Sequence, residues 1–138
     1  MEEIIIHTDG ASRSNPGPAG IGVAIFDSDY NLLAEIYEAI GETTNNIAEY
    51  TALIRGLEEG LKLSARRVTV YTDSELMARQ VRGEYRVKSQ GLLPLLGKVR
   101  TLMGRFESCQ VHHVPRERNK VADRLANKAL DEALKTQT

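Results

Sequence analysis

The sequence has little of several residue types that would indicate a special class of protein. Its 138 residues include one cysteine, four prolines and no tryptophan. The single thiol, Cys109, excludes an internal disulfide and argues against a cysteine-based zinc site. No apolar run approaches the roughly 20 residues that a transmembrane helix needs, and no basic segment opens the chain. We therefore expect no membrane association, no signal peptide and a cytoplasmic location.

Charge of one sign is also missing from the total, since the net charge is only −1. Residues 1–78 hold five Lys/Arg against thirteen Asp/Glu, whereas residues 79–118 hold nine against three. This asymmetry is typical of a polyanion bound beside acidic chemistry. The simpler alternative is that the basic side chains only solvate helix faces. These side chains are Arg79, Arg82, Arg86, Lys88, Lys98, Arg100 and Arg105.

The chain contains no repeat and no linker rich in Pro, Gly or Ser, so we expect a single domain over residues 1–138. Hydrophobic periodicity predicts the elements in the order β β β α β α α β α. The predicted strands are 4–6, 21–26, 32–40, 68–71 and 110–114, with a turn over 12–20. The predicted helices are 45–64, 74–83, 90–106 and a last one that Asn119 could cap.

This order predicts an α/β fold with a five-stranded mixed sheet flanked by helices. Three successive strands favour an antiparallel meander, and the later strand–helix alternation favours two parallel additions. Ligands of such sheets bind beyond the carboxyl ends of the parallel strands. Attention therefore falls on the residues that follow strands 4–6, 68–71 and 110–114.

Four carboxylates lie near these positions. Asp9 and Asp73 each follow a buried strand, Asp123 lies early in the last helix, and Glu49 lies early in the long helix. Taken singly, each has an ordinary explanation as a turn former, a helix cap, a favourable charge at a helix start or a solvated residue. They indicate a site only if the fold brings them together.

Four sequence blocks resemble type 1 ribonucleases H, in that family's order and over nearly the whole chain. They are TDGASRSNPGPAGIG at 8–22, TTNNIAEY at 43–50, YTDS at 71–74 and NKVADRLA at 119–126. The resemblance implies the ribonuclease H-like fold and an enzyme that hydrolyses the RNA strand of an RNA–DNA hybrid. It also implies that Asp9, Glu49, Asp73 and Asp123 are catalytic metal ligands.

Clustered carboxylates repel one another unless a dication neutralises them, and hard oxygen ligands select Mg²⁺ or Mn²⁺. The resemblance implies two ions per site, with Asp9 bridging them, and products with 5′-phosphate and 3′-hydroxyl ends. It assigns the sensing of the RNA 2′-hydroxyl to Gly10, Asn46 and Glu49.

Asn15 and Thr44 match positions that bind a phosphate of the DNA strand, although Asn15 would also suit a turn and Thr44 a helix cap. Arg86 and Lys88 are further candidates for contacts with the DNA strand.

The loop before Asp123 reads PRER at 115–118 and lacks the histidine that many members of the family carry there. Arg116 resembles a basic substitute for it, and Arg118 is the competing choice. A guanidinium does not lose its proton near neutrality, so the expected role is electrostatic.

The alternative functions are a catalytically weak module that binds hybrids, and a nuclease of the same fold that also cuts double-stranded RNA. We expect a monomer.

Overall fold

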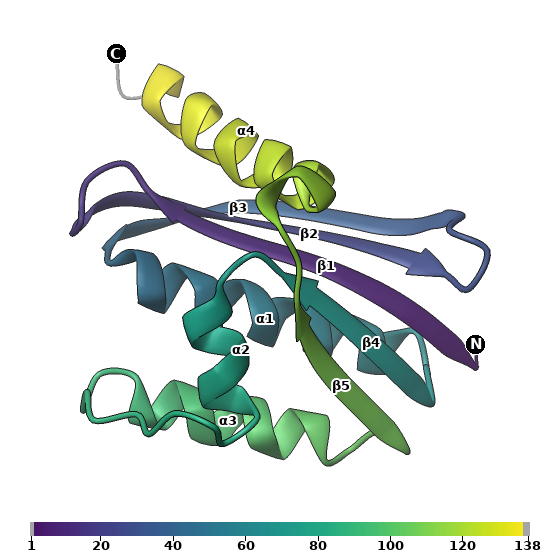
Figure 1. The fold of residues 1–138 in the computed structure, drawn as a ribbon. Coiled ribbons are helices and arrows are strands. Elements are labelled where there is room, and N and C mark those ends of the chain that lie inside the picture. Colours follow the sequence, from purple (N-terminus) through teal and green to yellow (C-terminus); the bar gives the residue numbers. More distant parts are fainter. Residues whose placement is uncertain (1, 137–138) are drawn as a thin grey trace.

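A computed structural model describes residues 2–136 of the chain (Figure 1). The strands are β1 (Glu3–Ser12), β2 (Gly17–Asp27), β3 (Leu32–Thr43), β4 (Arg67–Thr72) and β5 (Ser108–His113). The helices are α1 (Asn45–Lys62), α2 (Glu75–Val81), α3 (Leu93–Met103) and α4 (Lys120–Thr136), with a 3₁₀ turn, η1, at Arg116–Arg118. None of the helices within residues 2–136 has the length and hydrophobicity of a transmembrane segment.

The five strands form one mixed sheet in the order β3-β2-β1-β4-β5. The β1–β2 and β2–β3 pairs are antiparallel, whereas β1–β4 and β4–β5 are parallel. The predicted architecture, three antiparallel strands followed by two parallel ones, is therefore confirmed. Strand β4 ends at Thr72, opposite Thr8 of β1, so the residues that follow β4 lie beside the second half of β1.

The helices lie on opposite faces of the sheet (Figure 1). Helix α4 covers one face and packs on β1, β2 and β3, while α1 packs on β1 and β2 from the other face and is itself covered by α3. Between α1 and the sheet lies a core in which Ile6, Val70, Leu53 and Leu57 are fully buried. Each such side chain contributes roughly 1.5–3 kcal/mol through removal from water.

Two glycines set how closely the helices approach the strands. A Cβ added at Gly10 of β1 would lie 2.2 Å from the backbone carbon of Ala48 in α1. A Cβ added at Gly22 of β2 would lie 2.2 Å from the carbonyl oxygen of Ala122 in α4. Any larger residue would push the helix outward, so these positions fix both α1 and α4 against the centre of the sheet.

The predicted turn over residues 12–20 is too long, because β2 already begins at Gly17. The small residues Gly17, Ala19 and Gly20 read as a turn by composition, yet β1 and β3 both pair with them. Pro18 is tolerated at the start of the strand, where its carbonyl accepts a hydrogen bond of 2.9 Å from the Arg13 amide.

Helix α3 begins at Leu93 rather than at the predicted residue 90. Its first turn contains Pro94, which is tolerated because the first amides of a helix have no intrahelical hydrogen-bond partner. A turn over Ser89–Leu92 precedes the helix. Strand β1 runs to Ser12 rather than ending at the predicted residue 6, because residues 8–12 pair with β2 although they form no apolar run. Asp9 therefore lies inside β1, whereas the sequence predicted that it follows the strand. The remaining helices and strands occur within a few residues of their predicted bounds, the usual uncertainty of element ends.

Candidate active site

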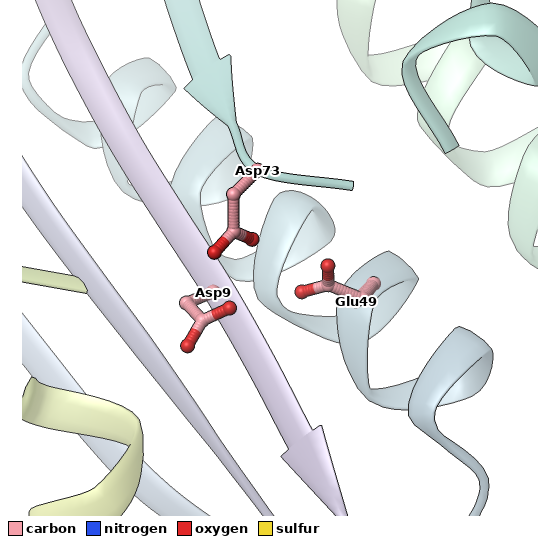
Figure 2. A group of neighbouring side chains, drawn as sticks. All are labelled: Asp9, Glu49 and Asp73. Carbon is pink, nitrogen blue, oxygen red and sulfur yellow. The ribbon is translucent and has the colours of Figure 1, made fainter. Parts of the chain in front are cut away.

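Three of the four predicted carboxylates converge beside the carboxyl end of β4, where β1 continues past it (Figure 2). Asp9 projects from β1, Asp73 follows β4, and Glu49 reaches them from the second turn of α1. One carboxylate oxygen from each lies within 4.8 Å of the others. Asp9 and Glu49 are buried and Asp73 is half-buried, so the group is shielded from bulk water.

Asp9 lies on the α4 side of strand β1, whereas Glu49 comes from α1, on the other face of the sheet. Asp9 is the register partner of Gly22, whose open face is covered by α4, whereas the next residue, Gly10, faces α1. Because Gly10 lacks a side chain, α1 approaches closely enough for the Gly10 amide to donate a hydrogen bond to Oε1 of Glu49. This bond fixes the Glu49 carboxylate beside Asp9.

Asp123 lies in the first turn of α4 and lines the same cleft as the other three carboxylates. Its Oδ1 accepts a hydrogen bond of 3.2 Å from Nη2 of Arg116. Asn127, one turn further along α4, donates a hydrogen bond of 3.0 Å to the Asp123 backbone carbonyl. All four carboxylates predicted from the sequence therefore face one cleft.

The electrostatics of the cleft record this crowding. Burial, together with the negative charges of Glu49, Asp73 and Asp123, raises the pKa of Asp9 to about 9. Burial raises the pKa of Glu49 to about 8, partly offset by the hydrogen bond from the Gly10 amide. Burial also raises the pKa of Asp73. The fold thus makes ionisation of these carboxyl groups unfavourable unless a cation is nearby.

Four of the six predicted substrate-binding residues lie around the amino-terminal end of α1. Gly10 and Asn46 line the carboxylate cleft, and Asn46 is exposed to solvent there. Asn15, Thr44 and Asn46 line an adjoining hollow, whose far side is formed by Ser89 and Leu92.

Two of these side chains also have local roles. Oγ1 of Thr44 caps α1 by accepting a hydrogen bond of 3.2 Å from the Ile47 amide. Oδ1 of Asn15 accepts one of 3.1 Å from the Asn45 amide. The local roles suggested by the sequence are therefore real, and both residues still border the hollow.

The two competing arginines of the loop before α4 occupy different places. Arg116 lines the carboxylate cleft and pairs with Asp123, whereas Arg118 lines a separate hollow with His7, Phe26 and Tyr30. This placement favours Arg116 as the residue near the chemistry, although its role stays a prediction. Arg86 and Lys88 are exposed on the segment between α2 and α3, and neither lines the carboxylate cleft.

Sequence reasoning missed the roles of two asparagines. Oδ1 of Asn45 accepts a hydrogen bond of 2.7 Å from the Ser12 amide and so joins the end of β1 to the start of α1. The sequence suggests Asn119 as a cap of α4. Its buried side chain bonds to β1 instead, since Nδ2 donates a hydrogen bond of 2.9 Å to the Thr8 carbonyl. Asn45 lies in the block TTNNIAEY and Asn119 in the block NKVADRLA. Their membership of these blocks was the only sequence signal that either asparagine has a role in the site.

Comparison with known proteins agrees with this site. The family model described as "Reverse transcriptase-like" matches residues 7–129. Bifunctional protein Rv2228c of Mycobacterium tuberculosis is 45% identical over 132 residues, which cover 95% of this chain and 36% of that protein. Ribonuclease HI of Halobacterium salinarum is 40% identical over 125 residues, which cover 91% of this chain and 63% of that protein.

This chain therefore spans only about a third of the mycobacterial protein and somewhat under two thirds of the halobacterial one. Among solved structures, LC11-RNase H1 in complex with an RNA/DNA hybrid superposes with a TM-score of 0.90 at 47% identity. That match covers 95% of this chain and 99% of the solved one. The sheet order, the convergent carboxylates and these similarities agree, and the chain belongs to the type 1 ribonuclease H family.

Proposed function

We propose that the chain is an endoribonuclease that hydrolyses the RNA strand of RNA–DNA hybrids with the help of two divalent ions and leaves 5′-phosphate and 3′-hydroxyl ends. The observation that carries the proposal is the convergence of Asp9, Glu49 and Asp73 within 4.8 Å, with Asp123 on the same cleft. A relative that superposes over nearly its whole length is known in complex with an RNA/DNA hybrid, which supports the choice of substrate.

The donor set fits hard divalent cations. All the candidate ligand atoms are carboxylate oxygens, which Mg²⁺ and Mn²⁺ prefer. The raised pKa values of Asp9 and Glu49 mean that their ionised forms are unfavourable alone, and a bound cation would stabilise these forms. Asp9, Glu49, Asp73 and Asp123 would hold the ions. When bound, such a pair of ions supplies an activated water and stabilisation of the leaving 3′ oxygen.

Discrimination of RNA from DNA falls to groups of the chain itself. A 2′-hydroxyl both donates and accepts hydrogen bonds, so a site that reads it needs partners of both kinds. The cleft offers the Glu49 carboxylate as an acceptor and the exposed Asn46 amide as a donor or acceptor, next to the Gly10 backbone. The adjoining hollow at Asn15 and Thr44 suits a phosphate of the DNA strand.

Arg116 contributes positive charge at the opening of the cleft. Its guanidinium is exposed and pairs with Asp123 at 3.2 Å, and it stays charged at every working pH. It therefore acts by attracting a phosphate group and by orienting Asp123, without moving a proton.

The alternative of a catalytically weak binding module is disfavoured by the same carboxylates. Pure binding of a polyanion gains nothing from negative charges that face its phosphates, and burial of Asp9 and Glu49 costs free energy in the absence of a cation. Cleavage of double-stranded RNA is compatible with 2′-hydroxyl sensing, so the assay includes it.

The test is cleavage of one end-labelled sequence presented as RNA–DNA hybrid, double-stranded RNA, single-stranded RNA and double-stranded DNA, each with Mg²⁺, Mn²⁺ or EDTA. We expect metal-dependent cutting of the RNA strand of the hybrid, lost in Glu49→Gln. The matched control is Glu58→Gln, which makes the same change at a half-exposed glutamate of the same helix and should keep activity.

Equal cutting of double-stranded RNA would widen the substrate class. Binding of hybrid with no cutting under any metal would refute the proposal in favour of the binding module.

A further inference from the structure

Five rings form a continuous row on the face of the sheet that α4 occupies. His7, Tyr71 and His112 are register partners on β1, β4 and β5, so their side chains point to the same face. The ring centroids of His7 and Tyr71 lie 5.2 Å apart, and those of Tyr71 and His112 lie 5.9 Å apart. Phe26 and Tyr30 extend the row on the other side, with Phe26 at 5.7 Å from His7 and Tyr30 at 5.2 Å from Phe26.

This row is only partly covered by the rest of the fold. Helix α4 packs on β1, β2 and β3, and no other helix of residues 2–136 lies on this face over β4 and β5 (Figure 1). Tyr30 is 54% exposed, and the other four rings are half-buried. Rings in a core would be covered, so this row is a surface rather than an extension of the core.

Hydrogen bonds hold three of the five rings in place. Nδ1 of His7 lies 3.1 Å from Oδ1 of the buried Asn119, and its Nε2 lies 3.3 Å from the Tyr30 hydroxyl. Nε2 of His112 lies 3.1 Å from Oε1 of Gln110. Rings fixed in this way lose little conformational freedom when a flat ligand stacks on them.

A hollow at one end of the row combines these rings with positive charge. It is lined by His7, Phe26, Tyr30 and Val121, with Arg118 and Lys120 at its rim. Within residues 2–136, Arg116 pairs with Asp123, whereas Arg118 and Lys120 form no ion pair. Glu117 also lines the hollow, so the rim keeps a net positive charge of one from these three residues.

The row directly borders the carboxylate cleft. His7 precedes Asp9 by two residues and therefore faces the same side of β1, about 7 Å away along the strand. The turn Arg116–Arg118 presents Arg116 to the cleft and Arg118 to the hollow. A nucleic-acid strand that leaves the cleft past this turn would meet the hollow next.

We propose that this hollow and the adjoining ring row bind unpaired nucleotides of single-stranded nucleic acid. A base stacks on Tyr30 and His7, its phosphate lies at Arg118 and Lys120, and further bases stack on Tyr71 and His112. Flat rings with polar edges and unpaired cations match a base joined to a phosphate, whereas an apolar peptide would leave the cations unused. The inference rests on the proposed function in that the strand reaches the hollow from the carboxylate cleft, but the two share no lining residue, so binding here can be measured without hydrolysis.

The test is binding of a fluorescently labelled single-stranded 12-mer RNA, a blunt hybrid, and the same hybrid with a single-stranded RNA tail at either end, all in EDTA. We expect at least one tail to strengthen hybrid binding about tenfold, the effect of one stacked base. Tyr30→Asn combined with Tyr71→Val should remove this gain and leave the affinity for the blunt hybrid unchanged. Tyr37→Val, a change of another exposed tyrosine on β3, is the control and keeps the gain.

Two milder variants keep the test valid if the double variant folds poorly. Tyr30→Asn alone is suited to the positive φ of 63° at that exposed position. Lys120→Ala should make the negative slope of log affinity against log salt shallower by about 0.7 for the single strand, the contribution of one phosphate contact. Equal affinity of tailed and blunt hybrids, or a gain that survives in these variants, would overturn the proposal. Binding of an apolar peptide instead of the oligonucleotides, lost in Tyr30→Asn, would overturn it too.

Discussion

Replacing Asp9 by asparagine should stabilise the metal-free protein while abolishing cleavage. Asp9 is 5% exposed, and its pKa is raised from 3.8 to about 9 by burial and by the charges of Glu49, Asp73 and Asp123. Asparagine has nearly the same shape and carries no charge. The change therefore removes the free-energy cost of burying a carboxyl group that is ionised in the unfolded chain, and it keeps the packing against β2 and α4.

The magnitude follows from the shift of this pKa. Because the folded pKa lies above the unfolded one, the contribution of Asp9 to stability is fully present below about pH 3.8 and is lost as the pH rises toward 9. At pH 7 the loss corresponds to about 4 kcal/mol, at 1.36 kcal/mol for each pH unit above the unfolded pKa. A domain of this size gains roughly 3 °C in Tm for each kcal/mol, so Asp9→Asn should melt roughly 12 °C higher at pH 7.

The assay is thermal unfolding in EDTA at several pH values between 4 and 8, followed by circular dichroism. The difference in Tm between Asp9→Asn and the wild type should be small at pH 4 and grow with pH. Asp29→Asn, a change of an exposed aspartate in the β2–β3 hairpin, is the control and should show no such trend.

Addition of Mg²⁺ should raise the Tm of the wild type and leave that of Asp9→Asn much less changed, because a ligand that binds only the folded state stabilises it. A metal-free Asp9→Asn protein that melts at or below the wild type at pH 7 would refute the clustered-carboxylate site.

Three further predictions concern α4, the loop and the metal. Gly22→Ala would place a Cβ 2.2 Å from the Ala122 carbonyl oxygen, so α4 must shift and kcat should fall at least about tenfold. Gly97→Ala, where the added Cβ meets no atom within 4 Å, is the control, and an unchanged kcat in Gly22→Ala would contradict this prediction. Arg116→Ala should lower kcat about tenfold with little change in KM, measured on a blunt hybrid; a larger effect from Arg118→Ala would reverse the assignment. Ca²⁺ in place of Mg²⁺ should bind in a calorimetric titration yet support little cleavage, because its looser coordination misplaces the attacking water. Robust turnover with Ca²⁺ would count against the two-ion proposal.

The sequence predicted the strand-end carboxylates for a physical reason. Asp9 and Asp73 each follow a short, strongly apolar β-branched run, and a parallel pair of strands brings such ends together whatever the rest of the fold. The order of elements along the chain followed from periodicity, and the antiparallel and parallel pairing followed from that order. The sequence blocks placed Glu49 and Asp123 in the set.

The convergence itself was not predictable from residues alone. Glu49 meets Asp9 only because α1 lies against the bare backbone of Gly10, a contact between positions 38 or more residues apart. The start of β2 at Gly17 was hidden for a related reason: residues without bulk resemble a turn until neighbouring strands supply their hydrogen bonds. The ring row depends on the register of β1, β4 and β5, which no local pattern reveals.

Asn119 links these features and indicates which parts of the site are rigid. Its side chain joins the start of α4 to the Thr8 carbonyl of β1 and to His7, so β1 and α4 cannot shift independently near the cleft. Together with the close contact at Gly22, this holds Asp123 at a fixed spacing from Asp9. Arg116, in contrast, is exposed and is held by its single pair with Asp123. The arginine is therefore the part of the site that can move when substrate enters or product leaves, while the carboxylates stay in place.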